Sequence, residues 1–223
     1  MVVQDDRRED EQRELFGLRE PKYPSRIGPD AILDIDGMEV EFELKSTTKE
    51  SVSTVRDFGM EHIRKWQGKH WLFGFYTANG KGLRFTRYAS PRMMETWVDK
   101  MHQYVWPDYV LAELVPQLVG YDAVKAMLGD KDWYTLEDAK AIQKKQYSKH
   151  RYHEMMDISD GYSPARMLQI VQDRCQYLLR RGSTLNNPHI PPDIFANFPK
   201  ITQDHSSQLR ELVHQELQRT NAS

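Results

Sequence analysis

Residues 28–46, GPDAILDIDGMEVEFELKS, combine several carboxylates and one lysine in a segment that alternates like a β-strand. The Asp-Gly pair at 36–37 predicts a type I′ turn between two antiparallel strands. With that turn, Asp30 and Glu43 lie opposite each other, and Lys45 follows on the same face. Opposed carboxylates repel unless a cation lies between them, and their oxygens are ligands that suit Mg²⁺. A metal, two carboxylates and an ammonium group together have the chemistry needed to hydrolyse a phosphodiester.

The apolar residues of the hairpin support the same register independently. Because side chains alternate along a strand, a one-residue slip would move every apolar side chain to the other face. In the predicted register Asp34 opposes Glu39, which makes a second acid pair without a lysine. The alternative is a solvated acidic face, in which Glu39, Glu41 and Glu43 serve only solubility. The apolar side chains that share one face are Ala31, Leu33, Ile35, Met38, Val40, Phe42 and Leu44.

These residues match a known pattern. A Pro-Asp pair that ends at Asp30, followed after twelve residues by Glu43-Leu44-Lys45, resembles the PD-(D/E)xK signature of a nuclease superfamily. The resemblance covers residues 28–90. It implies that Asp30 and Glu43 bind Mg²⁺ together with the backbone carbonyl of Leu44, and that Lys45 positions or activates the attacking water.

Some members of this superfamily add a glutamate from the first helix. Residues 4–18 alternate in charge and end in apolar residues, which predicts a helix with a modest apolar stripe. Glu11 and Glu14 are the candidates for the additional ligand in that helix.

Within the superfamily, the chain is similar to a type II restriction endonuclease. It has room for a compact catalytic core and a helical part, and it lacks the GxxxxGK[ST] motif of a nucleotide-hydrolysing motor. The resemblance implies an Mg²⁺-dependent homodimer that cuts double-stranded DNA at a specific site in a prokaryotic cytoplasm. Two alternatives are open: a repair, resolvase or transposon-end nuclease of the same fold, and a non-enzymatic nucleic-acid-binding protein.

Basic residues in three segments are expected to contact DNA. Residues 140–153 hold five Lys or Arg and no acidic residue, and the end of a predicted helix near Gly182 leads into a polar loop at 182–192. Lys and Arg bind phosphates, whereas Arg and Asn also read base edges. The alternatives are a solvated helix face and a helix end whose arginines stabilise its dipole. The expected contacts are Arg56, Arg64, Lys65, Lys144, Lys145, Lys149, Arg151, Arg180, Arg181, Asn186 and Asn187.

Hydrophobic periodicity and turn residues predict the elements that position these side chains. They indicate an α/β (α+β) fold with a mostly helical C-terminal half. The resemblance implies that the core is a restriction-endonuclease-like mixed sheet flanked by helices. We expect one domain, with a catalytic core at 1–105 and a helical extension at 106–223, which the resemblance implies would serve DNA recognition and dimer contacts. The predicted helices are 4–18, 53–69 (interrupted or started near Gly59), 91–105, 109–119, 122–128, 135–156, 164–181 and 206–219, and strands 70–77 and 83–89 form a second hairpin.

Composition narrows the class of protein. The 223 residues are 39% hydrophobic and include 11 Tyr, 8 Phe and 5 Trp, which excludes a disordered chain. The net charge of −2 excludes a histone-like polycation, so an anionic ligand would require a local basic surface. Cys175 is the single cysteine, which excludes an intramolecular disulfide and fits a reducing compartment. The charged N-terminus and the lack of a long apolar run predict a soluble, intracellular protein without membrane contact.

Overall fold

The computed structural model describes residues 2–23, 25, 28–56, 58–182 and 187–221. The chain forms two compact units, Met1–Tyr104 with Asn186–Ser223, and Val105–Leu185. The fold is mixed α+β with a helical C-terminal half, as predicted. The expected extension at 106–223 differs from this division, because the chain after the second unit returns to the first one and adds strands and a helix there.

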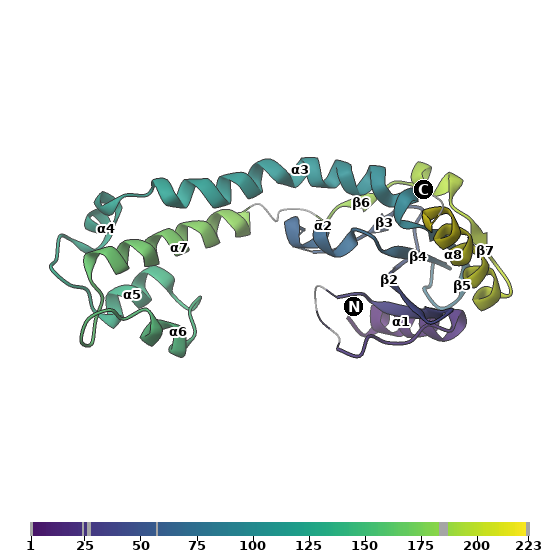
Figure 1. Cartoon of the computed structure of the whole chain (residues 1–223), viewed down its shortest axis with the longest axis horizontal. Coiled ribbons are helices and arrows are strands. Elements are labelled where there is room, and N and C mark those ends of the chain that lie inside the picture. Colours follow the sequence, from purple (N-terminus) through teal and green to yellow (C-terminus); the bar gives the residue numbers. More distant parts are fainter. Residues whose placement is uncertain (1, 24, 26–27, 57, 183–186, 222–223) are drawn as a thin grey trace. The chain divides into compact units, whose positions relative to one another are not determined.

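The first unit contains the mixed sheet and the helices that pack on it (Figure 1). Helix α3 (Pro91–Leu118) begins in this unit and ends in the second. The other elements of the first unit are α1 (Val2–Phe16), β1 (Ala31–Ile35), β2 (Met38–Thr47), β3 (Val52–Ser53), α2 (Met60–Trp66), β4 (His70–Tyr76), β5 (Leu83–Ala89), β6 (His189–Ile190), the 3₁₀ helix η1 (Pro192–Asn197), β7 (Lys200–Ile201) and α8 (His205–Asn221). The second unit contains the end of α3 with α4 (Tyr121–Leu128), α5 (Leu136–Gln143), α6 (Lys149–Glu154) and α7 (Pro164–Gly182).

The five-stranded sheet has the order β1-β2-β4-β5-β7. Strands β2 and β4 are parallel, and the other neighbours are antiparallel. The apolar face of the first hairpin packs with Phe16 at the end of α1 and with Leu209 and Val213 of α8. On the other face, Trp66 of α2 contacts Trp71 of β4. Both faces of the central strands are therefore covered, and Glu43 of β2 lies on the face toward α2.

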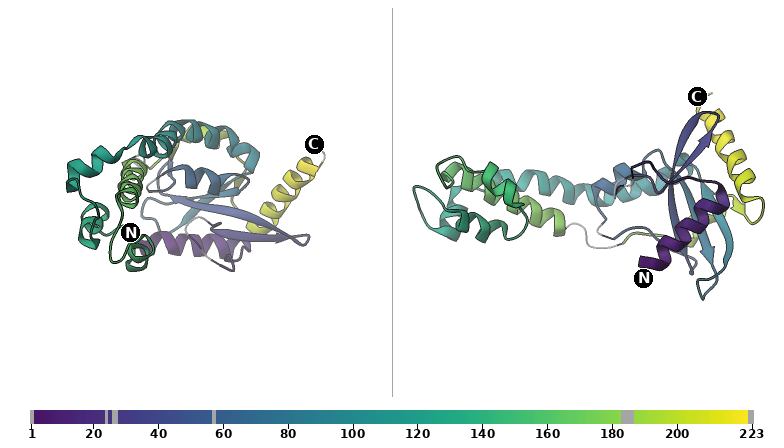
Figure 2. Two further views of the ribbon diagram at one scale, coloured as in Figure 1. Left: turned by 60° about the vertical axis from the view of Figure 1, so that its left-hand side comes forward. Right: turned by 90° about the horizontal axis from the view of Figure 1, so that it is seen from below.

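The predicted hairpin register is confirmed. Ala31 pairs with Phe42, Leu33 with Val40, and Asp34 with Glu39. Asp36 and Gly37 have φ values of 50° and 79°, as a type I′ turn requires. The hairpin runs beside α8 (Figure 2), where Arg210 donates a hydrogen bond to the Asp34 carbonyl at 2.9 Å.

Three helix predictions differ from the structure. Residues 91–118 form one helix that continues through Pro107. The predicted helix 135–156 breaks into α5 and α6, because Lys144 takes a left-handed φ of 55° and Ser148 caps the next helix. The predicted helix at 53–69 begins only at Met60, since Val52 and Ser53 pair with β6 instead.

A search of the helices in the described part of the chain finds none with the length and apolar character needed to span a membrane.

The turn that sets the hairpin register can be tested by substitution. Gly37→Ala is expected to lower the free energy of unfolding by about 1 kcal/mol, because a Cβ disfavours the left-handed conformation at φ 79°. Gly82→Ala is the matched control, since its added Cβ would meet Thr77 at an ordinary distance of 3.7 Å. Urea unfolding of both variants measures the difference, and equal losses would contradict the assigned role of the turn.

Candidate active site

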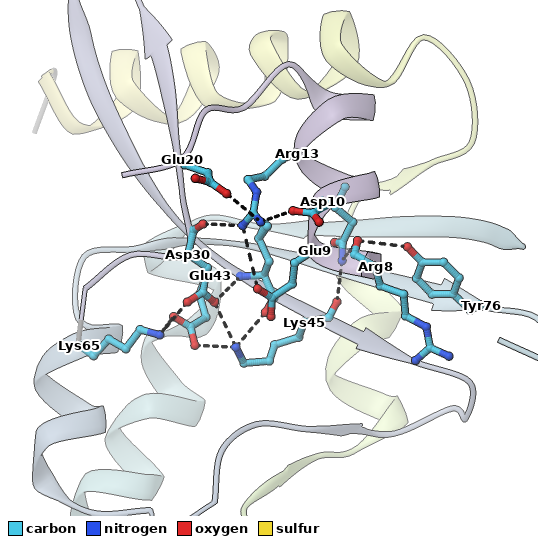
Figure 3. A network of polar contacts seen from close by, with 12 residues as sticks. Arg8, Glu9, Asp10, Arg13, Glu20, Asp30, Glu43, Lys45, Lys65 and Tyr76 are labelled. Carbon is cyan, nitrogen blue, oxygen red and sulfur yellow. Dashed lines mark hydrogen bonds and ion pairs between the residues drawn. The ribbon is translucent and has the colours of Figure 1, made fainter. Parts of the chain in front are cut away.

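Asp30 and Glu43 lie next to each other at the open end of the first hairpin (Figure 3). The backbone N–H of Asp30 donates to the carbonyl of Phe42 at 2.8 Å, which continues the ladder by one residue beyond β1. The Glu43 side chain is fully buried and that of Asp30 is 18% exposed. The hairpin therefore holds two carboxylates together in a site largely removed from water.

Two lysine ammonium groups bridge these carboxylates. Nζ of Lys45, on β2, lies 3.2 Å from Oδ2 of Asp30 and 2.7 Å from Oε1 of Glu43. Nζ of Lys65, on α2, lies 2.9 Å from Oδ1 of Asp30 and 2.7 Å from Oε2 of Glu43. Burying charges is unfavourable unless they are paired. Two positive and two negative charges make this cluster neutral, which explains how the acid pair is tolerated.

Neutral donors complete the cluster. The backbone N–H of Leu44 donates to Oδ2 of Asp30 at 3.0 Å, and the indole N–H of Trp66 donates to Oε1 of Glu43 at 3.3 Å. Lys45 also donates to the carbonyl of Leu44 at 2.8 Å. The motif residues thus meet one another directly, including the Leu44 carbonyl named by the resemblance.

The charges in the cluster fix the protonation states of Asp30 and Lys45. Burial opposes ionisation of Asp30, but the Lys45 and Lys65 charges outweigh it and lower its pKa to about 2. Burial also opposes the charged form of Lys45, yet the Glu43 and Asp30 carboxylates outweigh it and raise its pKa. At neutral pH, Asp30 is therefore a carboxylate and Lys45 an ammonium ion.

Glu9 of α1 joins this cluster, although Glu11 and Glu14 were the predicted candidates. Its side chain points toward Lys45 and the acid pair in Figure 3. On the same helix, Arg13 donates to the Asp30 carbonyl at 3.1 Å. Residues four apart share a helix face, so Glu9 lies on the face that Arg13 turns to the strand. The i, i+4 spacing from Arg13 is the signal that could have found it.

The environment of Glu9 makes its carboxyl group a weaker acid than an ordinary glutamate. Burial and the negative charge of Asp30 raise its pKa to about 7, against the opposing charges of Lys45 and Arg13. Glu11 instead faces Tyr76, whose pKa it raises together with burial. Glu9 is therefore partly protonated near neutral pH.

The second acid pair, Asp34 and Glu39, has its own cation. Nε of Arg19 lies 2.8 Å from Asp34, and its Nη2 pairs with Glu39. The hydrogen bond from Arg19 lowers the pKa of Asp34, although desolvation opposes the shift. Arg19 bridges this exposed pair and offsets one of its two negative charges, and the pair differs from the buried one in having no lysine.

The donor set suits a hard cation. Carboxylate oxygens of Asp30 and Glu43 and the Leu44 carbonyl are the oxygen ligands that Mg²⁺ prefers. These oxygens already surround the lysine ammonium groups, so the site stabilises positive charge. Among the residues that the structure describes, no three His, Cys, Asp or Glu side chains are arranged to hold a metal ion by themselves. A metal would therefore depend on the Leu44 carbonyl, water or substrate oxygens in addition to the acid pair.

The predicted DNA contacts of the first unit differ in how far their side chains are exposed. Arg56 and Arg64 are exposed, as phosphate contacts would be. The Lys65 side chain is 7% exposed and belongs to the acid cluster, so in this state it faces the acid pair, and its contact with phosphate stays a prediction. Asn187 is exposed, and Asn186 lies outside the described residues.

In the second unit, the break between α5 and α6 gathers basic side chains around a pocket of about 390 Å³. Lys144, Lys145 and Lys149 line this pocket, together with Tyr147. Arg151 lies over the Tyr147 ring, 5.7 Å from its centre. The break thus produces a concave basic surface in place of the expected continuous helix face.

The arginines at the end of α7 have partners within the second unit. Arg180 donates to Glu113 of α3, and Arg181 donates to the hydroxyl of Tyr177 at 2.9 Å. These side-chain contacts hold both arginines at the end of α7, and their contact with DNA stays a prediction.

No protein-family model and no curated protein sequence matches this chain. A functional assignment therefore depends on the chemistry of the site.

The raised pKa of Glu9 predicts a pH-dependent stability. The carboxyl binds its proton more tightly in the folded chain, so its contribution is greatest below about pH 4.5 and is lost as the pH rises through 7. In EDTA, Glu9→Gln is expected to raise the melting temperature at pH 8 and to change it little at pH 5. Thermal denaturation at both pH values is the measurement, with Glu14→Gln as the control on the same helix. A larger effect at pH 5 would contradict the assigned environment.

Proposed function

We propose that this protein is an Mg²⁺-dependent endodeoxyribonuclease of the PD-(D/E)xK type that hydrolyses phosphodiesters in double-stranded DNA. The observation that carries the proposal is the buried acid pair of Asp30 and Glu43, bridged by Lys45 from the same strand. A solvated acidic hairpin does not explain a fully buried Glu43 with a lysine 2.7 Å away. We further propose a type II restriction enzyme that acts in a prokaryotic cytoplasm.

The residues divide the chemistry between them. Asp30, Glu43 and the Leu44 carbonyl would hold Mg²⁺, which when bound supplies a Lewis acid and lowers the pKa of water. Lys45 remains protonated, because the neighbouring carboxylates raise its pKa. It therefore acts as a hydrogen-bond donor that orients the attacking water and stabilises negative charge on phosphate oxygens. It is not suited to removing a proton in this state.

Basic residues outside the cluster supply the phosphate contacts of the proposal. Arg56 and Arg64 are exposed in the unit that contains the acid pair. The pocket lined by Lys144, Lys145 and Lys149 offers a second positive surface. Contacts of this kind bind the DNA backbone without regard to sequence, and their affinity falls with salt.

The first experiment is incubation of plasmid and phage DNA with the wild type in Mg²⁺ or EDTA. We expect discrete, Mg²⁺-dependent fragments on a gel. Glu43→Gln and Lys45→Met are expected to slow cleavage by at least about a hundredfold, because the first removes a carboxylate that would hold the metal and the second removes the charge that stabilises the reacting phosphate. Asp34→Asn is the control, since this acid pairs with Arg19 outside the buried cluster.

The products decide the kind of activity. A smear in place of discrete fragments would point to a structure-reading or nonspecific nuclease. The absence of cutting on varied DNA substrates, or retained cutting by Glu43→Gln, would refute the proposed active site.

We also propose that the enzyme is a homodimer formed through α3. Pro107, Leu111, Leu114 and Leu118 are spaced by four, three and four residues, and the three leucines are 51–81% exposed. Ala112, on another side of the helix, is fully buried. This spacing forms the apolar seam of a paired helix, and a two-fold related copy presents the same seam. A second copy is therefore the partner that fits this stripe, and two active sites would cut both strands.

The stripe can be tested with charged substitutions. The double variant Leu111→Glu/Leu114→Glu is expected to convert a dimer into a monomer, because two buried carboxylates would be unpaired in the interface. Light scattering coupled to size-exclusion chromatography measures the mass. Met127→Glu, at an equally exposed apolar residue of α4, should leave the dimer intact. A monomeric wild type would contradict this assignment.

A further inference from the structure

We infer that Lys65 is an internal competitor of the metal, and that DNA phosphate releases it. This inference rests on the proposed function and adds a regulatory role for a residue outside the PD-(D/E)xK pattern. In this state the Lys65 ammonium bridges both carboxylates that would hold Mg²⁺. Binding of DNA would then prepare the site for the metal.

The contacts of the two lysines require that an ammonium group leave the carboxylates before a metal ion can bind them. Lys45 contacts Oδ2 of Asp30 and Oε1 of Glu43, and Lys65 contacts Oδ1 and Oε2 of the same residues. All four carboxylate oxygens therefore have an ammonium group within 3.2 Å. A divalent ion that coordinates both residues must replace at least one of these contacts, and it would also be repelled by the ammonium charge.

The partners of the two lysines indicate which of them would leave the carboxylates when a metal ion binds. Lys45 is on β2 beside Glu43 and has an additional acceptor, the Leu44 carbonyl at 2.8 Å. Within the described part of the chain, Nζ of Lys65 contacts the two carboxylates. Lys65 is on a different element, the seven-residue helix α2, so its side chain can move without changing the strand pairing that positions the motif. Lys65 is thus the lysine whose release leaves the motif intact.

A DNA phosphate offers the released ammonium a new anionic partner. The neighbouring Arg64 is exposed, so α2 presents basic character to solvent beside the buried Lys65. A ligand that stabilises the released position raises metal affinity, and by linkage the metal raises DNA affinity by the same factor. The two ligands of the proposed nuclease would therefore bind cooperatively.

The test measures Ca²⁺ binding by the full chain without DNA, using isothermal titration calorimetry. Ca²⁺ is the probe because it takes carboxylate and carbonyl oxygens. Lys65→Met is expected to bind Ca²⁺ about tenfold more tightly than the wild type, within the usual range of coupling between sites. Lys65→Arg, which keeps the charge, should show no such gain.

Lys69→Met is the matched control. Lys69 is also a buried lysine with a carboxylate partner, but it pairs with Glu41, outside the acid pair. Its Ca²⁺ affinity should equal that of the wild type. Melting temperatures in EDTA and in Ca²⁺ verify folding, and Ca²⁺ should raise the melting temperature of Lys65→Met more than that of the wild type.

Cooperativity is measured separately by fluorescence anisotropy of a labelled duplex. Ca²⁺ is expected to tighten DNA binding by the wild type at least about fivefold, and by Lys65→Met less. Equal or weaker Ca²⁺ binding by folded Lys65→Met would overturn the inference and make Lys65 a support of the acid pair, while Mg²⁺-dependent cutting by the wild type would still support the nuclease. Folded proteins that bind no Ca²⁺ in any variant, with or without DNA, would reject both.

Discussion

Glu43 is a fully buried carboxylate beside a second carboxylate, and this arrangement constrains much of the first unit. A buried charge must be paired, so cations have to reach it from fixed positions. Lys45 comes from the same strand and Lys65 from α2, which ties the helix to the sheet through charge as well as through packing. Trp66, next in the chain to Lys65, adds an indole donor and contacts Trp71. Electrostatics and aromatic packing thus position α2 over the neighbouring strands β2 and β4.

The hairpin part of the site could be predicted because its determinants are local. A two-residue period and the Asp36-Gly37 turn specify which side chains oppose each other, and the observed register is the one they predict. Lys65 and Glu9 could not be placed in this way. Their approach to Glu43 depends on how α1 and α2 pack on the sheet, and a pattern of charges along a helix does not specify which face is buried. Lys65 consequently resembled a surface phosphate contact in the sequence.

The helical half shows a similar limit. Apolar periodicity predicted most of the helices, but it did not predict that Lys144 adopts a left-handed conformation that divides residues 135–156. Nor did it predict that α8 packs in the core of the first unit, where Leu209 and Val213 meet the hairpin. Amphipathic helices carry the same signal whichever apolar surface they cover. Assignment to a unit therefore requires the tertiary contacts.

The charge balance connects Lys65 and Glu9, the two residues of the cluster that the sequence pattern did not place there. In the described state, Lys45 and Lys65 neutralise Asp30 and Glu43, and Glu9 is held partly protonated by burial and by Asp30. Replacing the single charge of Lys65 by a double positive charge would leave the cluster one unit positive. Ionised Glu9 would restore neutrality, and a positive neighbour is what favours its ionised form. Lys65 and Glu9 thus enclose the motif from two helices, and between them they would allow the cluster to be neutral with either cation in place.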